Sequence, residues 1–395
     1  MDRPFLTQEI YERINKLQQL MREHEIDGAL IIQKVDLYYL TGTDQDAHLW
    51  IPASDQPILM VRKSLERALS DSLIEKIIPL QSLSQLPVYI NDHGGKGSGR
   101  LGLEMDVVPV KMYLGYQRLF PHKTMVDISP LIRQLRMIKS PYEISLIKKA
   151  SQMADRLYER IPEFLHESET EIELASKAEA FYRKGGHPGI TRTRTFNMES
   201  VYGHIMGGPN STIPSNSPGP TAGSGLGPYL SQGSGFHRIG THEPIIVDYA
   251  SNVGGYISDQ ARIFSKGELD TKFYRAHDVM LKVQETLARE GRPGAKARDL
   301  YVLALEVVKD AGFLEGFMGY PLAVPFVAHG IGLEMDEWPL IAKDSDHILQ
   351  EGMIFAMEPK FVFPNEGVVG IENTFAVTEG GLERLNQYPD EIVIC

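Results

Sequence analysis

Five side chains in the last third of the chain are of the types that bind metal ions: Asp248, Asp259, His329, Glu358 and Glu372. Carboxylate and imidazole groups are the usual ligands of hard to borderline divalent cations. Their four negative charges would offset the four positive charges of two divalent ions. A pair of such ions can generate a nucleophile from water at neutral pH. The residue types therefore predict a metal-dependent hydrolase.

A predicted hairpin would bring two of these carboxylates together. The segments on either side of Val253-Gly254 have the apolar, alternating pattern of strands. A turn centred there would place Asp248 directly opposite Asp259, with Cβ atoms about 4.5–5.5 Å apart. Two carboxylates at that separation repel each other unless a proton or a cation lies between them. The first hairpin therefore predicts half of a cation site.

A second predicted hairpin has the same form. A turn centred on Asn365 would place Glu358 opposite Glu372. His329 would complete the site, and the glycines beside it (AHGIG) would let backbone and substrate approach the imidazole. One histidine beside glycines is weak evidence alone, but its combination with two acidic hairpins favours a metal centre.

Length and composition limit the class of protein. A chain of 395 residues is too long for one ordinary core, so two domains are expected. A net charge of −12 argues against binding to nucleic acid or to an anionic membrane. The only cysteine is Cys395, which excludes an intramolecular disulfide and favours a cytoplasmic location. We expect neither a signal peptide nor a membrane span.

Alternating helix and strand patterns predict a small α/β domain over residues 1–133. The expected strands are residues 29–32, 37–40, 57–61 and 101–104, and the expected helices are residues 11–24, 64–75 and 110–119.

Residues 134–395 are expected to form a second, larger domain that begins with two capped helices. Ser140 and Glu143 have the spacing of a capping box, with Pro141 at the first helical position. Ser168 and Glu171 repeat that spacing, which predicts a second helix. The Gly-, Ser- and Pro-rich residues 207–235 then form a long loop of the kind that is usually functional or disordered.

The motifs around the five candidate ligands resemble those of the pita-bread metallopeptidases, which include Xaa-Pro dipeptidase (prolidase) and aminopeptidase P. The resemblance rests on the segments IIVDYASNVGGYISDQARIF, VAHGIGLEMDEWP, FAMEPKFVFP and GIENTFAVTEGG. It implies an α+β pita-bread catalytic domain over residues 134–395, after a smaller α/β creatinase-like N-terminal domain over residues 1–133. It also implies two divalent ions (manganese, cobalt, iron or zinc), a homodimer and cleavage of short peptides or peptide-like amides by metal-activated hydroxide.

The resemblance assigns a role to each candidate ligand. Asp248 would bind one ion, Asp259 and Glu372 would bridge, and His329 would bind the second ion. Glu358 would bind metal and also carry the proton between the attacking water and the leaving nitrogen.

The chain departs from the family pattern around these ligands. Asp336 and Ser215 stand where histidines are expected. Gly370 stands in place of an arginine, Lys360 in place of a glycine, and Asn373 in place of an aspartate. Residues around a metal shell orient the ligands and stabilise charge on the substrate, so these changes predict an altered substrate or a different source of donors.

His237 is the replacement donor that we expect from the sequence, because it follows the long loop and precedes Asp248. A surface histidine beside Arg238 is the alternative. Two alternative functions also remain open at this stage: the same metal site acting on a non-peptide small molecule by C–N hydrolysis or lysis, and a catalytically weak metal- or ligand-binding protein.

Overall fold

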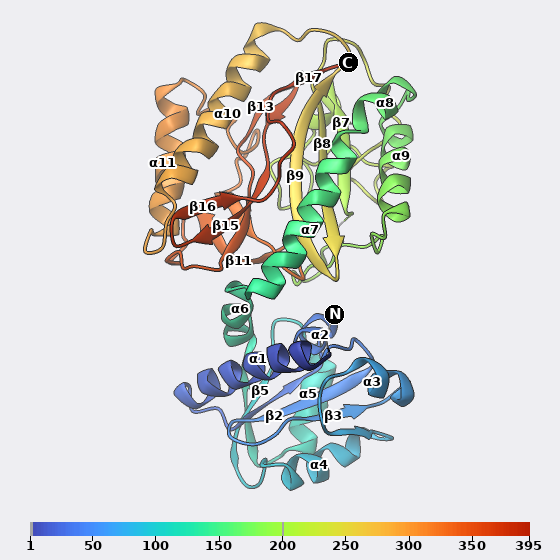
Figure 1. The fold of residues 1–395 in the computed structure, drawn as a ribbon, viewed down its shortest axis with the longest axis vertical. Helices are drawn as coiled ribbons and strands as arrows, with labels where there is room; N and C mark the ends of the chain where they lie inside the picture. Colours follow the sequence, from blue (N-terminus) through green and yellow to red (C-terminus); the bar gives the residue numbers. More distant parts are fainter. Residues whose placement is uncertain (1–2, 200) are drawn as a thin grey trace. The chain divides into compact units, whose positions relative to one another are not determined.

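The computed structural model describes residues 3–199 and 201–395, and the chain divides into two compact units. The first unit ends at Arg136 and the second begins at Met137. The expected boundary after residue 133 lies three residues before this division. Figure 1 shows the two units, each with its own sheets and helices.

The first unit is built on one six-stranded mixed sheet with the order β4-β3-β2-β1-β5-β6. Its buried face packs the side chains of Leu30, Trp50 and Leu101 against the helices. Its helices and strands are α1 (Arg3–Glu23), β1 (Gly28–Ile31), α2 (Lys34–Thr41), β2 (Ala47–Pro52), β3 (Ile58–Val61), α3 (Leu65–Asp71), β4 (Ile77–Pro79), η1 (Leu83–Gln85), α4 (Leu86–Asp92), β5 (Gly99–Leu103), α5 (Val110–Leu119), β6 (Lys123–Asp127) and α6 (Ser129–Met137).

One predicted strand of this unit is wrong, because residues 37–40 belong to helix α2. The side chain of Gln33 caps the start of the helix by accepting a hydrogen bond from the backbone N–H of Asp36. Gly42 ends the helix in the left-handed conformation, with its N–H donating to the carbonyl of Tyr38. Both end signals are local, and they outweigh the strand preference of the apolar run.

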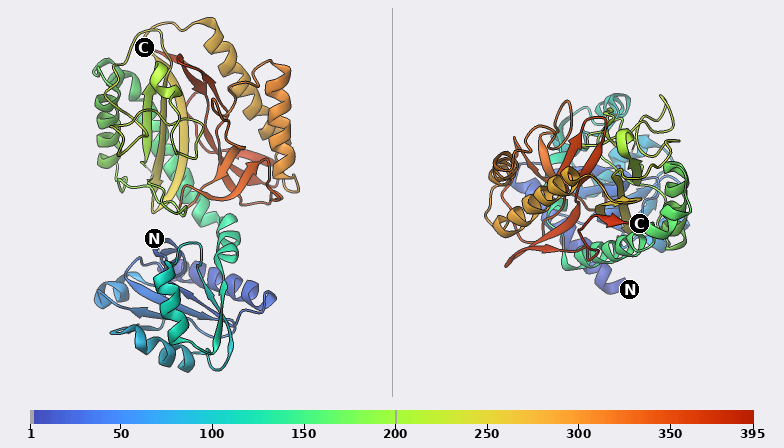
Figure 2. Two further views of the ribbon diagram at one scale, coloured as in Figure 1. Left: turned by 180° about the vertical axis from the view of Figure 1, so that it is seen from behind. Right: turned by 90° about the horizontal axis from the view of Figure 1, so that it is seen from above.

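The second unit contains a four-stranded sheet (β17-β9-β8-β7), a five-stranded sheet (β11-β10-β12-β15-β16) and the hairpin β13-β14. Helices α7, α8 and α9 lie on one side of these strands and α10 and α11 on the other (Figures 1 and 2). The helices are α7 (Pro141–Tyr158), α8 (Ile161–His166), α9 (Glu171–Lys184), η2 (Gly208–Thr212), α10 (Thr271–Glu290) and α11 (Ala297–Asp310). The strands are β7 (Gly203–Gly207), β8 (Ile245–Val253), β9 (Tyr256–Ser265), β10 (Phe326–Gly330), β11 (Glu337–Ala342), β12 (Ile354–Met357), β13 (Lys360–Phe363), β14 (Gly367–Gly370), β15 (Asn373–Thr378), β16 (Gly381–Arg384) and β17 (Val393–Ile394).

The first predicted capping box is confirmed and the second is shifted. Ser140 and Glu143 form the box that starts α7, with Pro141 in the first turn. Helix α9 starts two residues later than predicted, with Thr170 and Glu173 forming its box. Glu171 is instead buried and accepts hydrogen bonds from the long loop.

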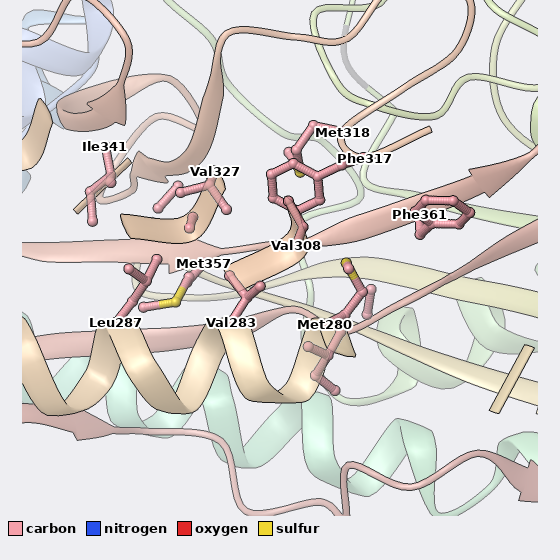
Figure 3. Close-up of a cluster of buried hydrophobic side chains, with 14 of the residues drawn as sticks. Met280, Val283, Leu287, Val308, Phe317, Met318, Val327, Ile341, Met357 and Phe361 are labelled. Carbon is pink, nitrogen blue, oxygen red and sulfur yellow. The ribbon is translucent and has the colours of Figure 1, made fainter. Parts of the chain in front are cut away.

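In the second unit, the alternation of side chains along a strand places apolar residues on one face and polar residues on the other. Met357 and Phe361 belong to the apolar core, and Figure 3 shows Met357 beside Leu287 and Val283 of α10. Glu358 and Lys360, which alternate with them along the chain, point to the opposite face, since successive side chains of a strand alternate. The same segment thus anchors the hairpin and presents polar groups on its other side.

Across the part of the chain that the structure describes, every helix is too short or too polar to cross a membrane.

Candidate metal centre

The hairpin β8-β9 places Asp248 and Asp259 on one face of its sheet, but not directly opposite each other. Asp248 pairs with Ala261, so the predicted register is wrong by two residues. The turn lies one residue later than predicted, at Gly254-Gly255, where both glycines have positive φ. A shift of two residues preserves the facing of every side chain, so the two carboxylates remain neighbours along a diagonal.

The second acidic hairpin has the register that the sequence predicts. Strands β13 and β14 pair around Asn365, which has a positive φ of 62°. Strands β12 and β15 continue the same register, with Met357 opposite Asn373. Glu358 and Glu372 lie between these two ladders and therefore opposite each other, as predicted.

His329 comes from β10, which pairs with β12 beside the second hairpin. Its Nε2 atom lies 3.9 Å from Oδ2 of Asp259, 3.7 Å from Oε1 of Glu358 and 3.7 Å from Oε1 of Glu372. These separations are too long for hydrogen bonds. One ligand atom from each of Asp259, His329 and Glu372 falls within 4.8 Å of the others, as a metal site requires.

Lys360 also reaches this cluster, a contact that the sequence pattern did not predict. Its Nζ atom donates to Oδ2 of Asp248 at 2.8 Å, to Oε2 of Glu358 at 2.7 Å and to Oε2 of Glu372 at 2.9 Å. The residue is only 1% exposed. The signal that could have revealed it was the departure from glycine directly after the Glu-Pro pair.

The two glutamates therefore divide their oxygen atoms between two groups. Oε2 of Glu358 and of Glu372 binds the ammonium of Lys360, while Oε1 of each faces His329. Asp248 lies on the Lys360 side and Asp259 on the His329 side. The arrangement is that of two cation positions bridged by two carboxylates.

The charges of the cluster shift one another's pKa values. Burial would lower the pKa of Lys360, but Asp248, Glu358 and Glu372 raise it well above its usual range, so the ammonium stays charged. Burial would raise the pKa of Glu372, yet Lys360 and His329 lower it to about 2. Burial raises the pKa of Glu358 to about 7 against the attraction of Lys360.

On the His329 side of the cluster, the pKa values of both Asp259 and His329 are raised. Burial, Glu372 and Asp248 raise the pKa of Asp259 well above its usual range. Burial would lower the pKa of His329, but the neighbouring carboxylates raise it to about 10. A carboxyl that tends to hold a proton beside an imidazolium indicates a surplus of negative charge that a metal ion could neutralise.

A cavity of about 270 Å³ opens onto the cluster. Apolar side chains of Phe326, Met335 and Leu340 form part of its wall, and residues 217–221 of the long loop form another part. Asp259, His329, Glu358, Glu372 and Lys360 are all among its lining residues. The charged cluster is therefore accessible to a small molecule that has an apolar portion.

Buried polar residues behind the cluster fix its two hairpins to each other. Thr374 Oγ1 accepts from the backbone N–H of Asp259 and donates to its carbonyl, both at 3.0 Å. Arg262 donates to the carbonyl of Glu372 at 2.9 Å and to the side chain of Asn373 at 2.8 Å. These bonds hold Asp259 and Glu372 in place independently of their carboxylates.

The two residues that replace expected histidines have other partners. Ser215 is half-buried, and its hydroxyl lies 3.0 Å from that of Ser231. Asp336 lines the cavity but accepts hydrogen bonds from the backbone N–H groups of Arg194 and Thr195, each at 2.8 Å. Asp336 thus fixes a wall of the cavity.

Two other histidines lie near the site in different settings. His237 is placed outside the cavity lining, with Nε2 3.8 Å from Glu243, so its donor role stays a prediction. His204 lines the cavity and pairs with Asp248 across β7 and β8. Its Nδ1 atom is buried and has no hydrogen-bond partner among the described residues.

Comparison with known proteins gives matches over nearly the whole chain. The model of metallopeptidase family M24 matches residues 145–379, more than half of the chain, and that of the creatinase/prolidase N-terminal domain matches residues 13–138. The Xaa-Pro dipeptidase of Pyrococcus furiosus is 25% identical over 97% of this chain and 99% of its own. A dipeptidase structure from Pyrococcus horikoshii, 28% identical, superposes with a TM-score of 0.78 over 97% of this chain and 100% of that one.

The same fold also occurs in a more distant protein. The N-terminal domain of the FACT complex subunit SPT16 from Cicer arietinum gives a TM-score of 0.75 at 14% identity, over 97% of each chain. At that identity the likeness concerns the fold alone. The matches together confirm the predicted pita-bread fold with a creatinase-like N-terminal domain.

Proposed function

Because this chain belongs to metallopeptidase family M24, we propose that it hydrolyses an amide bond in a short peptide, as its Xaa-Pro dipeptidase relatives are named for doing. One observation carries the proposal: Asp259, His329, Glu358 and Glu372 converge at the wall of a cavity with room for a small substrate.

The groups around His329 fit one divalent ion. Ligand atoms that bind an ion at about 2.0–2.2 Å lie roughly 3–4 Å from one another. The distances of 3.7, 3.7 and 3.9 Å from His329 Nε2 to its carboxylate neighbours fall in that range. A divalent ion held there would lower the pKa of water and polarise a substrate carbonyl.

The chain's own residues would position the substrate and move its proton. Phe326, Met335 and Leu340 would bind the apolar part of the substrate and exclude water. Glu358, one of whose oxygens faces the His329 side, would take the proton from water and pass it to the leaving nitrogen. The lone pair or N–H of His204 Nδ1 would be available to a polar group of the substrate.

An activity panel tests the proposal. The purified protein, stripped of metal and reloaded separately with Mn²⁺, Co²⁺, Fe²⁺ or Zn²⁺, is offered Xaa-Pro dipeptides, Xaa-Ala dipeptides and longer Xaa-Pro peptides. We expect metal-dependent cleavage of a dipeptide that is lost in Glu358→Gln. Absence of cleavage of every peptide by a folded, metal-loaded protein would contradict the proposal.

A second candidate function is hydrolysis or lysis of a C–N bond in a non-peptide molecule by the same site. The arrangement of Asp336 and Ser215 favours it, because neither position supplies an imidazole to the cavity. Cyclic amides and N-acyl amines, offered under the same conditions, separate the two candidates by which class is consumed.

The donor role of His237 has its own test. His237→Ala with full activity and unchanged metal content would contradict it, whereas a selective fall in kcat would support it. A cytoplasmic location, suggested by the single cysteine, and a homodimer remain parts of the proposal. Light scattering of the purified chain tests the assembly.

A further inference from the structure

We infer that the ammonium of Lys360 permanently occupies one of the two cation positions, so that each chain binds a single divalent ion on the His329 side. The inference deepens the proposed function and rests on it for the identity of the cluster as a metal site.

The contacts of Lys360 are those of a cation enclosed by ligands. Its Nζ atom has three oxygen neighbours at 2.7–2.9 Å, one from each of Asp248, Glu358 and Glu372. An ammonium group has three N–H donors, so these three carboxylates use all of them. Three of the five ligands that the sequence predicts for two metal ions thus already bind a positive charge supplied by the chain.

The backbone around Lys360 directs its side chain to this position. Lys360 begins β13 directly opposite Gly370 of β14. A Cβ atom added to Gly370 would lie 2.5 Å from the carbonyl oxygen of Pro359, 2.7 Å from Cα of Lys360 and 2.9 Å from Cγ of Lys360. The glycine at position 370 therefore permits the close approach of this backbone together with the first carbons of the lysine side chain.

Displacement of the ammonium by a metal ion would be unfavourable. Lys360 is only 1% exposed, and its withdrawal would leave three buried carboxylates without their cation. The adjoining Phe361 and Val362 are themselves buried in the core and limit the movement of this segment. Lys360 is thus a fixed part of the site.

The other cation position keeps a complete set of ligands. His329 Nε2, Asp259 Oδ2 and Oε1 of both glutamates make no contact with the ammonium through those atoms. Glu358 and Glu372 would bridge between an ammonium and one metal ion. The formal cationic charge would be three, from the ammonium and one divalent ion, against the four negative charges of the carboxylates.

Metal stoichiometry tests this inference directly. The full chain is stripped with chelator, titrated with Mn²⁺ alone by calorimetry, and analysed for metal content after desalting. Electron paramagnetic resonance distinguishes an isolated Mn²⁺ ion, with resolved hyperfine lines, from a pair coupled through bridging carboxylates. We expect one ion per chain and the uncoupled spectrum.

The variant Lys360→Gly should open the second position. We expect its stoichiometry to double and its spectrum to show coupling, while Lys266→Gly, which removes a lysine bonded to the carbonyl of Ser168, should behave like the native chain. If Lys360→Gly does not fold, Lys360→Ala opens the same position.

Several outcomes would overturn the inference. They are two ions or a coupled pair in the native chain, no bound ion in the native chain, and one ion in a folded Lys360→Gly variant. Titration of the native chain with Mn²⁺ tests the inference even if both variants fail to fold. Since binding is measured without substrate, a chain that binds one ion but cleaves no peptide would contradict the proposed function alone.

Discussion

Each unit of this protein buries a cluster of carboxylates with a cation, but only one of the clusters is open. In the first unit, Arg136 lies 2.7 Å from Asp36, and both side chains are almost fully buried. Glu104 accepts hydrogen bonds there from the backbone N–H groups of Ile32 and Gln33. In the second unit, the carboxylates of the candidate metal centre line a cavity, and the Oε1 atoms of Glu358 and Glu372 face His329 at 3.7 Å, beyond hydrogen-bond distance.

The difference indicates what each cluster does. In the closed cluster, Arg136 compensates the buried charge of Asp36, so removing the guanidinium leaves an uncompensated charge. Carboxylates left facing one another destabilise the fold unless a cation binds, and proteins retain such arrangements where function needs them. We therefore expect changes to the closed cluster to affect stability and changes to the open cluster to affect activity.

The largest expected effect is that of Arg136→Met on stability. Loss of the guanidinium leaves Asp36 buried without its cation, which should lower the free energy of unfolding by about 3–5 kcal/mol. Urea unfolding measures this change, and Arg118→Met, at an exposed position, is the control with an effect within about 0.5 kcal/mol. Activity per folded molecule should stay the same, and a fall in activity without loss of stability would break the distinction.

Asp259→Asn should have the opposite profile. Activity should fall at least ~100-fold if Asp259 binds metal as proposed, because even supporting residues around such ligands contribute ~10–100-fold. Stability of the metal-free protein should be unchanged or higher, since burial and the neighbouring carboxylates already favour a neutral group at this position. Comparison of kcat/KM and urea midpoints with those of the exposed control Asp310→Asn checks both parts.

Thr374→Val sharpens the comparison because it should lower both activity and stability. It removes the two hydrogen bonds between Thr374 and the backbone of Asp259. We expect a roughly 10-fold loss of activity and metal affinity, with a loss of about 1 kcal/mol in stability. Unchanged metal affinity in calorimetry would show that the backbone of Asp259 needs no such support.

Glu104→Gln should change how stability depends on pH. Burial and the neighbouring Asp36 raise the pKa of Glu104 in the folded state well above its unfolded value of 4.5. The folded state therefore holds a proton that the unfolded state releases, and this group's contribution to stability falls as pH rises above about 4.5. The urea concentration at the unfolding midpoint should fall between pH 5 and pH 8. This fall should be smaller in Glu104→Gln than in the native chain or in the exposed control Glu75→Gln.

The sequence predicted the parts of the site that depend on local pattern. Glu358 and Glu372 were placed opposite each other because a single turn around Asn365 fixes the register of both flanking ladders. Asp248 and Asp259 were placed two residues out of register because two consecutive glycines allow the turn at either of two positions. The strand period of two kept their facing correct even so.

The rest depended on distances that no local pattern encodes. Lys360 joins the cluster because its long side chain extends beside a glycine on the neighbouring strand. His204 faces the cavity because β7 pairs with β8, a contact between segments separated by the long loop. The position of His237 depends on the path of that loop, which contains few apolar anchors.

The burial of Glu171 has a consequence for how this protein could be re-engineered. Its carboxylate accepts from the backbone N–H groups of Gly207 and Gly235 and from the side chain of Asn210. One residue of α9 therefore secures both ends of the long loop, while residues 217–221 between them border the cavity. The loop can serve as an exchangeable cassette, whose sequence or length is varied to retune selectivity while its attachment points stay in place.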